Sequence, residues 1–175
     1  MFWRMLVAEE SAVDRFLIRD ADSRVNEREA ACVREWIASG KGFHVIRDHP
    51  NHAKPVMGGL WGARSEIMPG LVEQIHLWTA LSLAHERDEI YDSDQAFLAR
   101  IIWPRFKVDS IQHDSCLLAH FHGSVPIPGD TGTPTAEAWR FCGERFDEND
   151  QADPRGWQER INRMTWEANA TGENR

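Results

Sequence analysis

The sequence is poor in lysine, in cysteine and in long apolar runs, and each shortage excludes a class of protein. Its 175 residues carry a formal net charge of −8 and no cluster of Lys and Arg. Proteins that coat nucleic acid need a basic face to neutralise phosphates, so this class is excluded. No stretch approaches the roughly 20 apolar residues that cross a bilayer, and the start lacks the basic and apolar regions of an export signal. We expect a soluble chain with no nucleic-acid partner and no transmembrane segment.

Paired thiols and phosphate-binding glycine motifs are also missing. The three cysteines, Cys32, Cys116 and Cys142, are an odd number at wide spacings, and none belongs to a C-x-x-C pair. Such usage is typical of reduced thiols in a cytoplasmic protein rather than of a disulfide framework. The spacings G-x-x-x-x-G-K-[ST] and G-x-G-x-x-G do not occur. The sequence therefore predicts a cytoplasmic protein without either phosphate-binding loop.

The sequence does contain a strand, helix and strand in succession. Residues 13–20 contain three consecutive apolar residues with strand propensity that lead into charged ones, and residues 43–50 repeat this pattern before a proline. Between them, residues 27–39 place apolar side chains at helical spacing. Asn26 followed by Glu29 is a capping box that begins the helix. This pattern predicts an α/β fold, in which ligands gather at the carboxyl ends of the strands.

Two aspartates follow the first predicted strand and suggest a metal site. Because side chains alternate along an extended segment, we expect Asp20 and Asp22 to leave the strand on the same side. Two carboxylates so close need a positive partner, and Mg²⁺ or Mn²⁺ is the natural candidate. The alternative is that both are turn acids paired with Arg19 and Arg24 on a solvated loop.

Other polar and glycine-rich segments add candidate site residues. Asp48 and His49 follow the second strand, so we expect them on the same rim of the sheet. Gly58 and Gly59 precede Trp61, and glycines placed so closely indicate either a bend or a close approach of the backbone to a ligand.

Several of these segments together resemble bacterial glycosyltransferase-like proteins of the GT-A type. The resemblance covers about residues 2–115 and rests on five pieces, namely residues 19–24 with 28–29, 47–50, 57–62, 94–98 and 113–114. It implies a partial GT-A-like mixed sheet flanked by helices. The catalytic core would span residues 1–123. Residues 124–175 would add a loop, an acidic linker and a C-terminal helix that packs on the core.

The resemblance also implies roles for individual residues. Asp20 and Asp22, with His113 or alternatively His122, would hold Mn²⁺ or Mg²⁺ against the diphosphate of a nucleotide sugar. The residues implied in substrate binding are Arg19, Arg24, Asp48, His49, Gly58, Gly59 and Trp61, with the glycines and tryptophan as the wall of the sugar site. Asp94 and Gln95 would open a helix beside the reacting sugar and act as base or orienting pair.

The implied function is metal-dependent transfer of a sugar from a nucleotide diphosphate donor to a carbohydrate or other hydroxyl acceptor. One alternative is a non-catalytic carbohydrate-binding or interaction domain. A second alternative is a D-x-D phosphatase. That motif needs Thr or Val two residues after the second Asp, and this sequence has Arg24 there, which argues against it. Only nineteen residues precede Asp20, too few for the nucleotide-binding half of a GT-A enzyme. We therefore expect an exposed sheet edge that could pair with a partner chain or a second copy.

Overall fold

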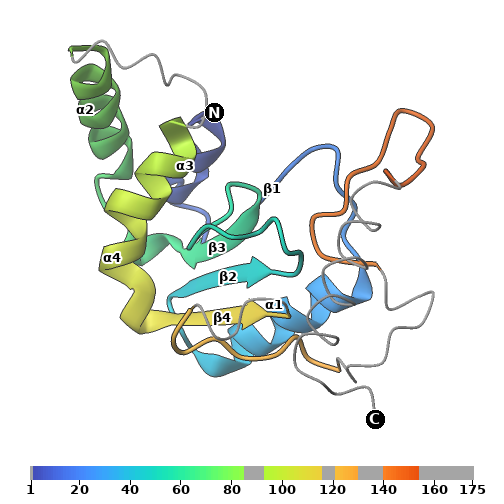
Figure 1. Ribbon diagram of the computed structural model, residues 1–175. Coiled ribbons are helices and arrows are strands. Elements are labelled where there is room, and N and C mark those ends of the chain that lie inside the picture. Colours follow the sequence, from blue (N-terminus) through green and yellow to red (C-terminus); the bar gives the residue numbers. More distant parts are fainter. Residues whose placement is uncertain (1, 85–92, 116–120, 130–139, 154–175) are drawn as a thin grey trace.

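A four-stranded mixed sheet forms the centre of the protein. The computed structural model describes residues 2–84, 93–115, 121–129 and 140–153 (Figure 1). The strands are β1 (Arg15–Arg19), β2 (Phe43–Arg47), β3 (Leu60–Arg64) and β4 (Ser110–Asp114). Their order is β1-β3-β2-β4, with β3 antiparallel to both neighbours and β2 parallel to β4. The predicted α/β class is confirmed.

Helices lie on both sides of this sheet. The α-helices are α1 (Glu27–Ser39), α2 (Leu71–Ala84), α3 (Ser93–Phe97) and α4 (Trp103–Phe106). The 3₁₀ helices are η1 (Trp3–Glu9), η2 (Ser65–Ile67) and η4 (Lys107–Asp109), and a π-helical turn η3 (Leu98–Ile102) joins α3 to α4. No helix within the described residues is long and apolar enough to cross a membrane.

The α1 helix begins and ends where the sequence predicts. The side chain of Asn26 accepts a hydrogen bond from Glu29 N at 2.9 Å, which satisfies a free N–H of the first turn. Gly40 follows the last turn with φ +69°, a conformation that favours glycine. These two residues fix the helix that covers one face of the sheet.

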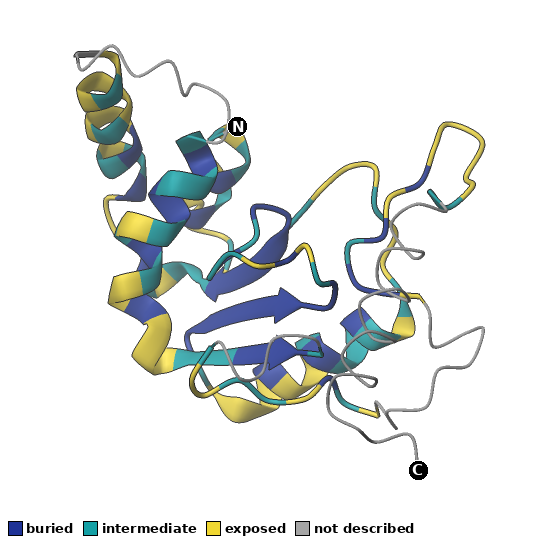
Figure 2. Ribbon diagram, in the orientation of Figure 1, coloured by how far each residue is buried: buried dark blue, intermediate teal, exposed yellow. Residues whose placement is uncertain are grey.

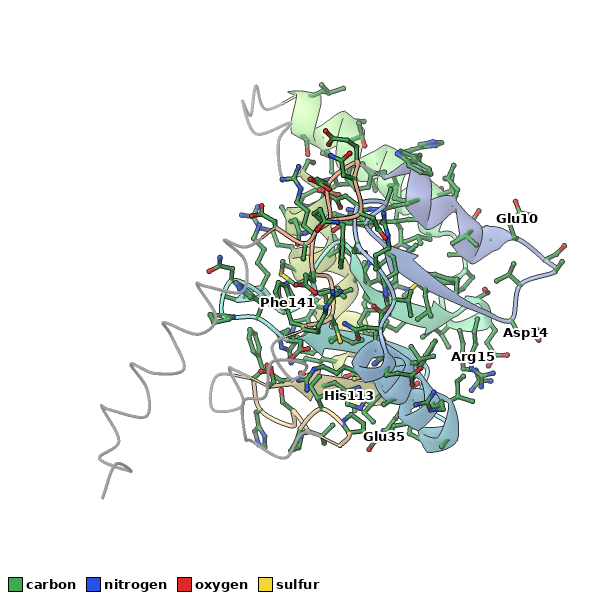
Figure 3. All side chains as sticks on the ribbon, turned by 90° about the vertical axis from the view of Figure 1, so that its right-hand side faces the viewer. Glu10, Asp14, Arg15, Glu35, His113 and Phe141 are labelled. Atoms are coloured by element: carbon green, nitrogen blue, oxygen red, sulfur yellow. The ribbon has the colours of Figure 1, made fainter. Side chains whose placement is uncertain are left out.

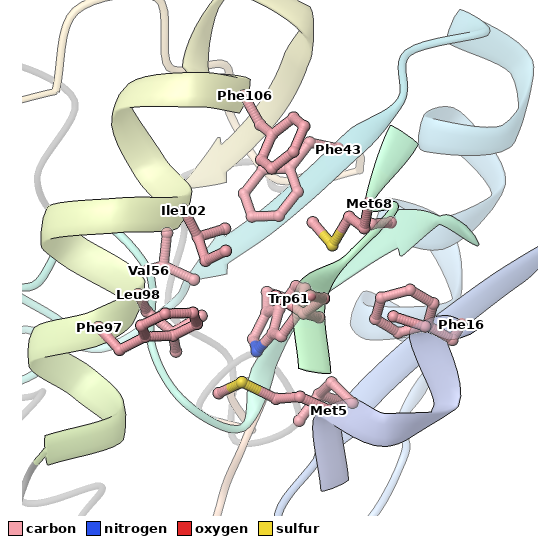
Figure 4. Packing of buried hydrophobic residues seen from close by; sticks show 14 of the residues in the cluster. Met5, Phe16, Phe43, Val56, Trp61, Met68, Phe97, Leu98, Ile102 and Phe106 are labelled. Carbon is pink, nitrogen blue, oxygen red and sulfur yellow. The ribbon is translucent and has the colours of Figure 1, made fainter. Parts of the chain in front are cut away.

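The larger core lies on the other face of the sheet, around Trp61. This ring is fully buried, with its centroid 5.4 Å from that of Phe16 and 5.6 Å from that of Phe43 (Figure 4). Met5 of η1 and Leu98 of η3 are also fully buried in this cluster. Two segments far apart in the sequence, η1 and η3, therefore meet over the sheet. Most residues of the strands are buried (Figure 2).

A smaller core lies under α1 and includes the segment 140–153. Cys32 of α1 and Cys142 are both buried and free, in agreement with the predicted reduced thiols, whereas Cys116 lies outside the described residues. A hydrogen bond with Cys32, together with burial, raises the pKa of the Cys142 thiol. Phe146 N donates to Asp22 O at 2.7 Å, which ties this segment to the loop after β1.

The first strand is shorter than the predicted residues 13–20. The first strand ends at Arg19 rather than at Asp20, because Ser23 N donates to Asp20 O at 3.1 Å and closes a turn there. The predicted C-terminal helix, about residues 154–170, lies outside the described residues. β1 pairs only with β3 among the described strands, so it forms an edge of the described sheet. Pairing of that edge with a partner stays a prediction.

Candidate functional site

The two aspartates of the D-x-D segment point to different partners. Asp20 Oδ1 lies 2.5 Å from Arg4 Nη1, whereas Asp22 Oδ2 lies 3.1 Å from Arg145 Nε. The expectation that both carboxylates leave a strand on the same side is wrong. Alternation of side chains holds only along extended backbone, and the turn that begins at Asp20 ends it.

Arg4 joins Asp20 to Asp94, a residue 74 positions further along the chain. Its Nη2 donates to Asp94 Oδ2 at 3.0 Å, while its Nη1 donates to Asp20. We call Arg4, Asp20, Asp94 and Gln95 the arginine cluster. The side chains of Arg4 and Asp94 are 13% and 11% exposed, against 53% for Asp20. The cluster is therefore mostly buried and reaches solvent through Asp20.

Gly58 and Gly59 form the floor of the arginine cluster. A Cβ atom at Gly58 would lie 2.7 Å from Arg4 Nη2, and a Cβ atom at Gly59 would overlap the Asp20 carboxylate. Both glycines thus lie in close approach to the chain's own side chains, which occupy the space above them in this conformation. The predicted role of the two glycines as a wall of the sugar site stays a prediction.

Gln95 of α3 forms hydrogen bonds with the loop that contains Gly58 and Gly59. With its amide oriented to satisfy both groups, its oxygen accepts from Gly58 N at 2.7 Å and its nitrogen donates to Val56 O at 3.1 Å. These bonds replace backbone partners that the loop lacks. Gln95 therefore positions the loop.

The Asp94 carboxylate keeps its charge despite its burial. Burial alone favours the neutral acid and would raise the pKa of Asp94. Hydrogen bonds and positive charges around the carboxylate, Arg4 among them, outweigh burial, so the pKa of Asp94 is lowered. Asp94 Oδ1 also accepts a hydrogen bond from Gln95 N at 3.0 Å, at the first turn of α3. An ionised carboxylate of this kind orients a hydroxyl group and is a weak base.

Trp61 does not present a stacking face. Its ring is 0% exposed and packs between Phe16 and Phe43. The prediction that it stacks on a sugar is wrong for this structure, because β3 runs through the middle of the core and buries this residue.

Arg19 and Arg24 are engaged within the protein. Arg19 pairs with the buried carboxylate of Glu29, and its Nη1 donates to Trp61 O at 3.2 Å. Arg24 Nε lies 2.8 Å from Asp150 Oδ1. Neither belongs to the arginine cluster, so the predicted phosphate contacts would require these pairs to rearrange.

Asp48 and His49 follow β2 as predicted but lie inside the protein. Asp48 is fully buried and accepts hydrogen bonds from Arg28 at 2.8 and 3.0 Å, Ser115 Oγ at 2.5 Å and Cys142 N at 2.9 Å. The ring of His49 is 3% exposed and is centred 4.6 Å from that of Phe141. These residues hold the segment 140–153 against α1 and the ends of β2 and β4.

His113 lies on the α1 side of the sheet. Its Nδ1 is 2.9 Å from His44 Nε2 and its Nε2 is 3.3 Å from Glu35 Oε2 (Figure 3). Burial lowers the pKa of His113, although Glu35 works against this shift. The alternative residue, His122, is exposed.

The predicted metal ligands therefore do not converge. Asp20, Asp22 and His113 bond to three different partners, and the described part of the chain holds no group of three or more His, Cys, Asp or Glu residues that could bind a metal ion. A hard divalent cation takes six or more oxygen ligands. In this arrangement the residues do not fit Mn²⁺ or Mg²⁺.

The chain matches no family model, no curated protein and no solved structure. The GT-A resemblance thus stays a prediction, and the site is judged by its own geometry. Five residues predicted for one site, Asp20, Gly58, Gly59, Asp94 and Gln95, do lie together although they come from three separate segments.

Sequence reasoning missed Arg4. Its partners lie 16 and 90 residues away, so no local motif contains them. The available signal was its position as the one charged residue within the apolar run of residues 2–7. A single arginine in such a run needs a partner once the run is buried.

A hollow in the described part of the chain lies apart from the arginine cluster. It measures about 450 Å³ and lies where η1 ends, β1 begins and β3 ends. Glu10 and Asp14, which line it, are drawn well to the right of Glu35 and His113 in Figure 3. None of the predicted site residues lines this hollow. The site considered below is therefore the arginine cluster.

Proposed function

We propose that this chain is the sugar-handling part of a glycosyltransferase, which moves a sugar from a nucleotide diphosphate donor to a hydroxyl acceptor. The observation that supports the proposal is the convergence of Asp20, Gly58 and Asp94 on Arg4. The GT-A resemblance predicts these three residues as parts of one site. Convergence of segments this far apart is not a consequence of local sequence.

The cluster suits recognition of sugar hydroxyls. Carboxylate oxygens accept hydrogen bonds from hydroxyl groups, and charged partners make such bonds stronger than neutral ones. In the proposed reaction the acceptor oxygen bonds to the anomeric carbon as the bond from that carbon to the diphosphate breaks. The acceptor hydroxyl proton passes to solvent, and Asp94 orients that hydroxyl. No step is assigned to a metal ion.

A matched pair of substitutions in one turn tests the proposal. Asp20→Asn removes a charge from the cluster, whereas Asp22→Asn removes a charge whose partner is Arg145. We expect Asp20→Asn to weaken binding of UDP- or GDP-sugars roughly tenfold or more, since a hydrogen bond to a charged group contributes about 1.5–3 kcal/mol. Asp22→Asn should stay within about twofold.

Calorimetry measures the binding, and release of the nucleoside diphosphate in the presence of hydroxyl acceptors measures the transfer. Equal losses in the two variants would instead support the paired-aspartate metal site. If wild-type protein neither binds a nucleotide sugar nor releases the diphosphate, the proposed function is wrong.

The second candidate is a carbohydrate-binding domain without catalysis. The observation in its favour is that Arg19 and Arg24, the residues predicted to bind phosphate, are engaged in ion pairs. This candidate predicts equal affinity for a free sugar and its nucleotide diphosphate, with no release of the nucleotide. The same titrations separate the two candidates.

A further inference from the structure

The two edges of the described sheet differ in what covers them. Along β4, Val125 N donates to Gln112 O at 2.8 Å and Asp114 N donates to Val125 O at 2.9 Å, so another segment of the chain covers this edge. Along β1, no backbone hydrogen bond joins residues 15–19 to a described residue outside β3. The sheet is therefore open at β1 within the described part of the chain.

The register of β1 identifies the backbone groups on this open edge. In an antiparallel pair, residues bonded to the neighbouring strand alternate with residues whose N–H and C=O point away from it. Ser65 N donates to Asp14 O at 3.0 Å, and these two residues continue the register of β1 and β3. The bonds to β3 therefore belong to the even-numbered residues of β1. The outward N–H and C=O groups belong to Arg15, Leu17 and Arg19.

The side chains of the same three residues lie on the α1 side of the sheet, because burial alternates along β1 and Arg19 pairs with Glu29 of α1. That pair balances the charge of Arg19. Leu17 is 40% exposed. Arg15 is exposed, and no described ion pair includes it. A strand that joins this edge thus meets an exposed apolar side chain and, two residues away, a positive charge without a counter-charge.

A second copy of this chain does not complement the edge. The outward groups of one strand bond to the outward groups of the other, so Arg15 would lie opposite an odd-numbered residue of the second copy. The nearest such residues are Val13, Arg15, Leu17 and Arg19, and none is acidic. Pairing between two copies would leave the charge of Arg15 unbalanced or place a like charge opposite it, which is destabilising.

We propose that β1 is a docking edge for an extended segment of a different protein, which pairs antiparallel with residues 15–19 and places an acidic side chain opposite Arg15. Strand addition takes its affinity from main-chain hydrogen bonds and its specificity from alternate side chains. Because the partner runs in the opposite direction, its apolar residue opposite Leu17 comes two positions before the acid. The proposal does not involve the arginine cluster and stands apart from sugar transfer.

Two capped peptides test the proposal in NMR titrations of the isotope-labelled full chain. The matching peptide is Thr-Thr-Thr-Val-Thr-Glu-Thr, and the control peptide has Lys in place of Glu. We expect the matching peptide to shift the amide signals of Arg15, Leu17 and Arg19 and to slow their hydrogen exchange. It should bind roughly threefold or more tightly than the control, since opposite charges across paired strands attract and like charges repel.

Charge reversal locates the preference at one residue. Arg15→Glu keeps every backbone group and changes an exposed side chain, so it should fold, and we expect it to prefer the Lys peptide by a similar factor. Arg34→Glu, at an exposed position of α1, is the control and should keep the wild-type preference. The proposal is overturned if neither peptide affects the β1 amides at millimolar concentration, or if Arg15→Glu leaves the preference unchanged.

Hydrogen exchange of the free chain tests the other occupant. The Leu17 amide should exchange at the same rate at low and high protein concentration, because no second copy covers it. Slower exchange of this amide at high concentration would show that β1 pairs with itself, and would overturn the proposal. Either failure concerns β1 alone and leaves the test of nucleotide-sugar binding unaffected.

Discussion

At the scale of single residues, the arginine cluster shows how much depends on the absence of a side chain. Gly59 has no positive φ, yet a Cβ atom there would overlap the Asp20 carboxylate, which would have to move. A glycine kept for space differs from one kept for backbone freedom, such as Gly40 with φ +69°. The two kinds respond differently to substitution.

Gly59→Ala tests this steric requirement. We expect the added methyl group to push the half-exposed Asp20 carboxylate away from Arg4 and to lower the free energy of unfolding by up to about 1 kcal/mol, the usual contribution of a partly exposed ion pair. Urea denaturation measures the change. In an Asp20→Ala background the same substitution should cost much less, because the overlapping carboxylate is gone. Additive effects of the two substitutions would contradict the overlap.

His44 makes stability depend on pH. Its pKa is lowered well below the ordinary value by burial first, then by His113 and Arg19. Because the unfolded chain then binds a proton more readily than the folded one, protonation favours unfolding. The stability from neutral His44 is fully present above about pH 6.5, the unfolded value, and is lost as pH falls towards the folded value.

Urea denaturation at pH 7.5, 6.5 and 5.5 measures this dependence. His44→Gln should show a smaller fall in the free energy of unfolding across this range than wild type. The exposed residue His122 provides the control, and His122→Gln should keep the wild-type slope. If His44→Gln and wild type lose stability in parallel, the assignment to His44 is wrong.

At the scale of elements, Asp48 connects parts of the chain that are far apart. Its carboxylate accepts from Arg28 of α1, from Ser115 after β4 and from Cys142 N. In the ion pair with Arg28, the Asp48 side chain is fully buried and the Arg28 side chain is 16% exposed. Loss of one partner from such a pair leaves the other charge without compensation.

Asp48→Ala should therefore destabilise the protein by about 3–5 kcal/mol. Chemical denaturation measures the loss, and hydrogen exchange at Cys142 N should become faster as the segment 140–153 loosens. The exposed pair of Glu27 and Arg34, 3.6 Å apart, gives the matched control. Glu27→Ala should change stability by less than about 0.5 kcal/mol. Similar effects of both substitutions would rule out a connecting role for Asp48.

The scale of elements is also where the sequence was most informative. The α1 helix and its caps could be predicted because the periodicity of residues 27–39 and the Asn26 cap are local signals. The position of Asp48 after β2 followed from the same logic. What it contacts did not, because Arg28, Ser115 and Cys142 come together only through the tertiary fold.

At the scale of the whole molecule, the candidate site depends on contacts that local patterns do not contain. Asp20 and Asp94 were predicted for one site from a resemblance, but their shared partner Arg4 was not. The direction of the Asp22 side chain was mispredicted because the turn that begins at Asp20 ends the extended backbone, along which side chains alternate. The resemblance implied Trp61 as part of the wall of the sugar site, whereas β3 carries it through the core.

Strand β1 forms an edge of the described sheet. β1 has a described neighbour on one side only, and such strands invite unplanned stacking between molecules. Positive side chains stand at both ends of this strand, at Arg15 and Arg19, with Leu17 between them. Glu29 balances the charge of Arg19, so the charge exposed on this border is that of Arg15. A partner strand that pairs with this border should therefore place an acidic side chain opposite Arg15.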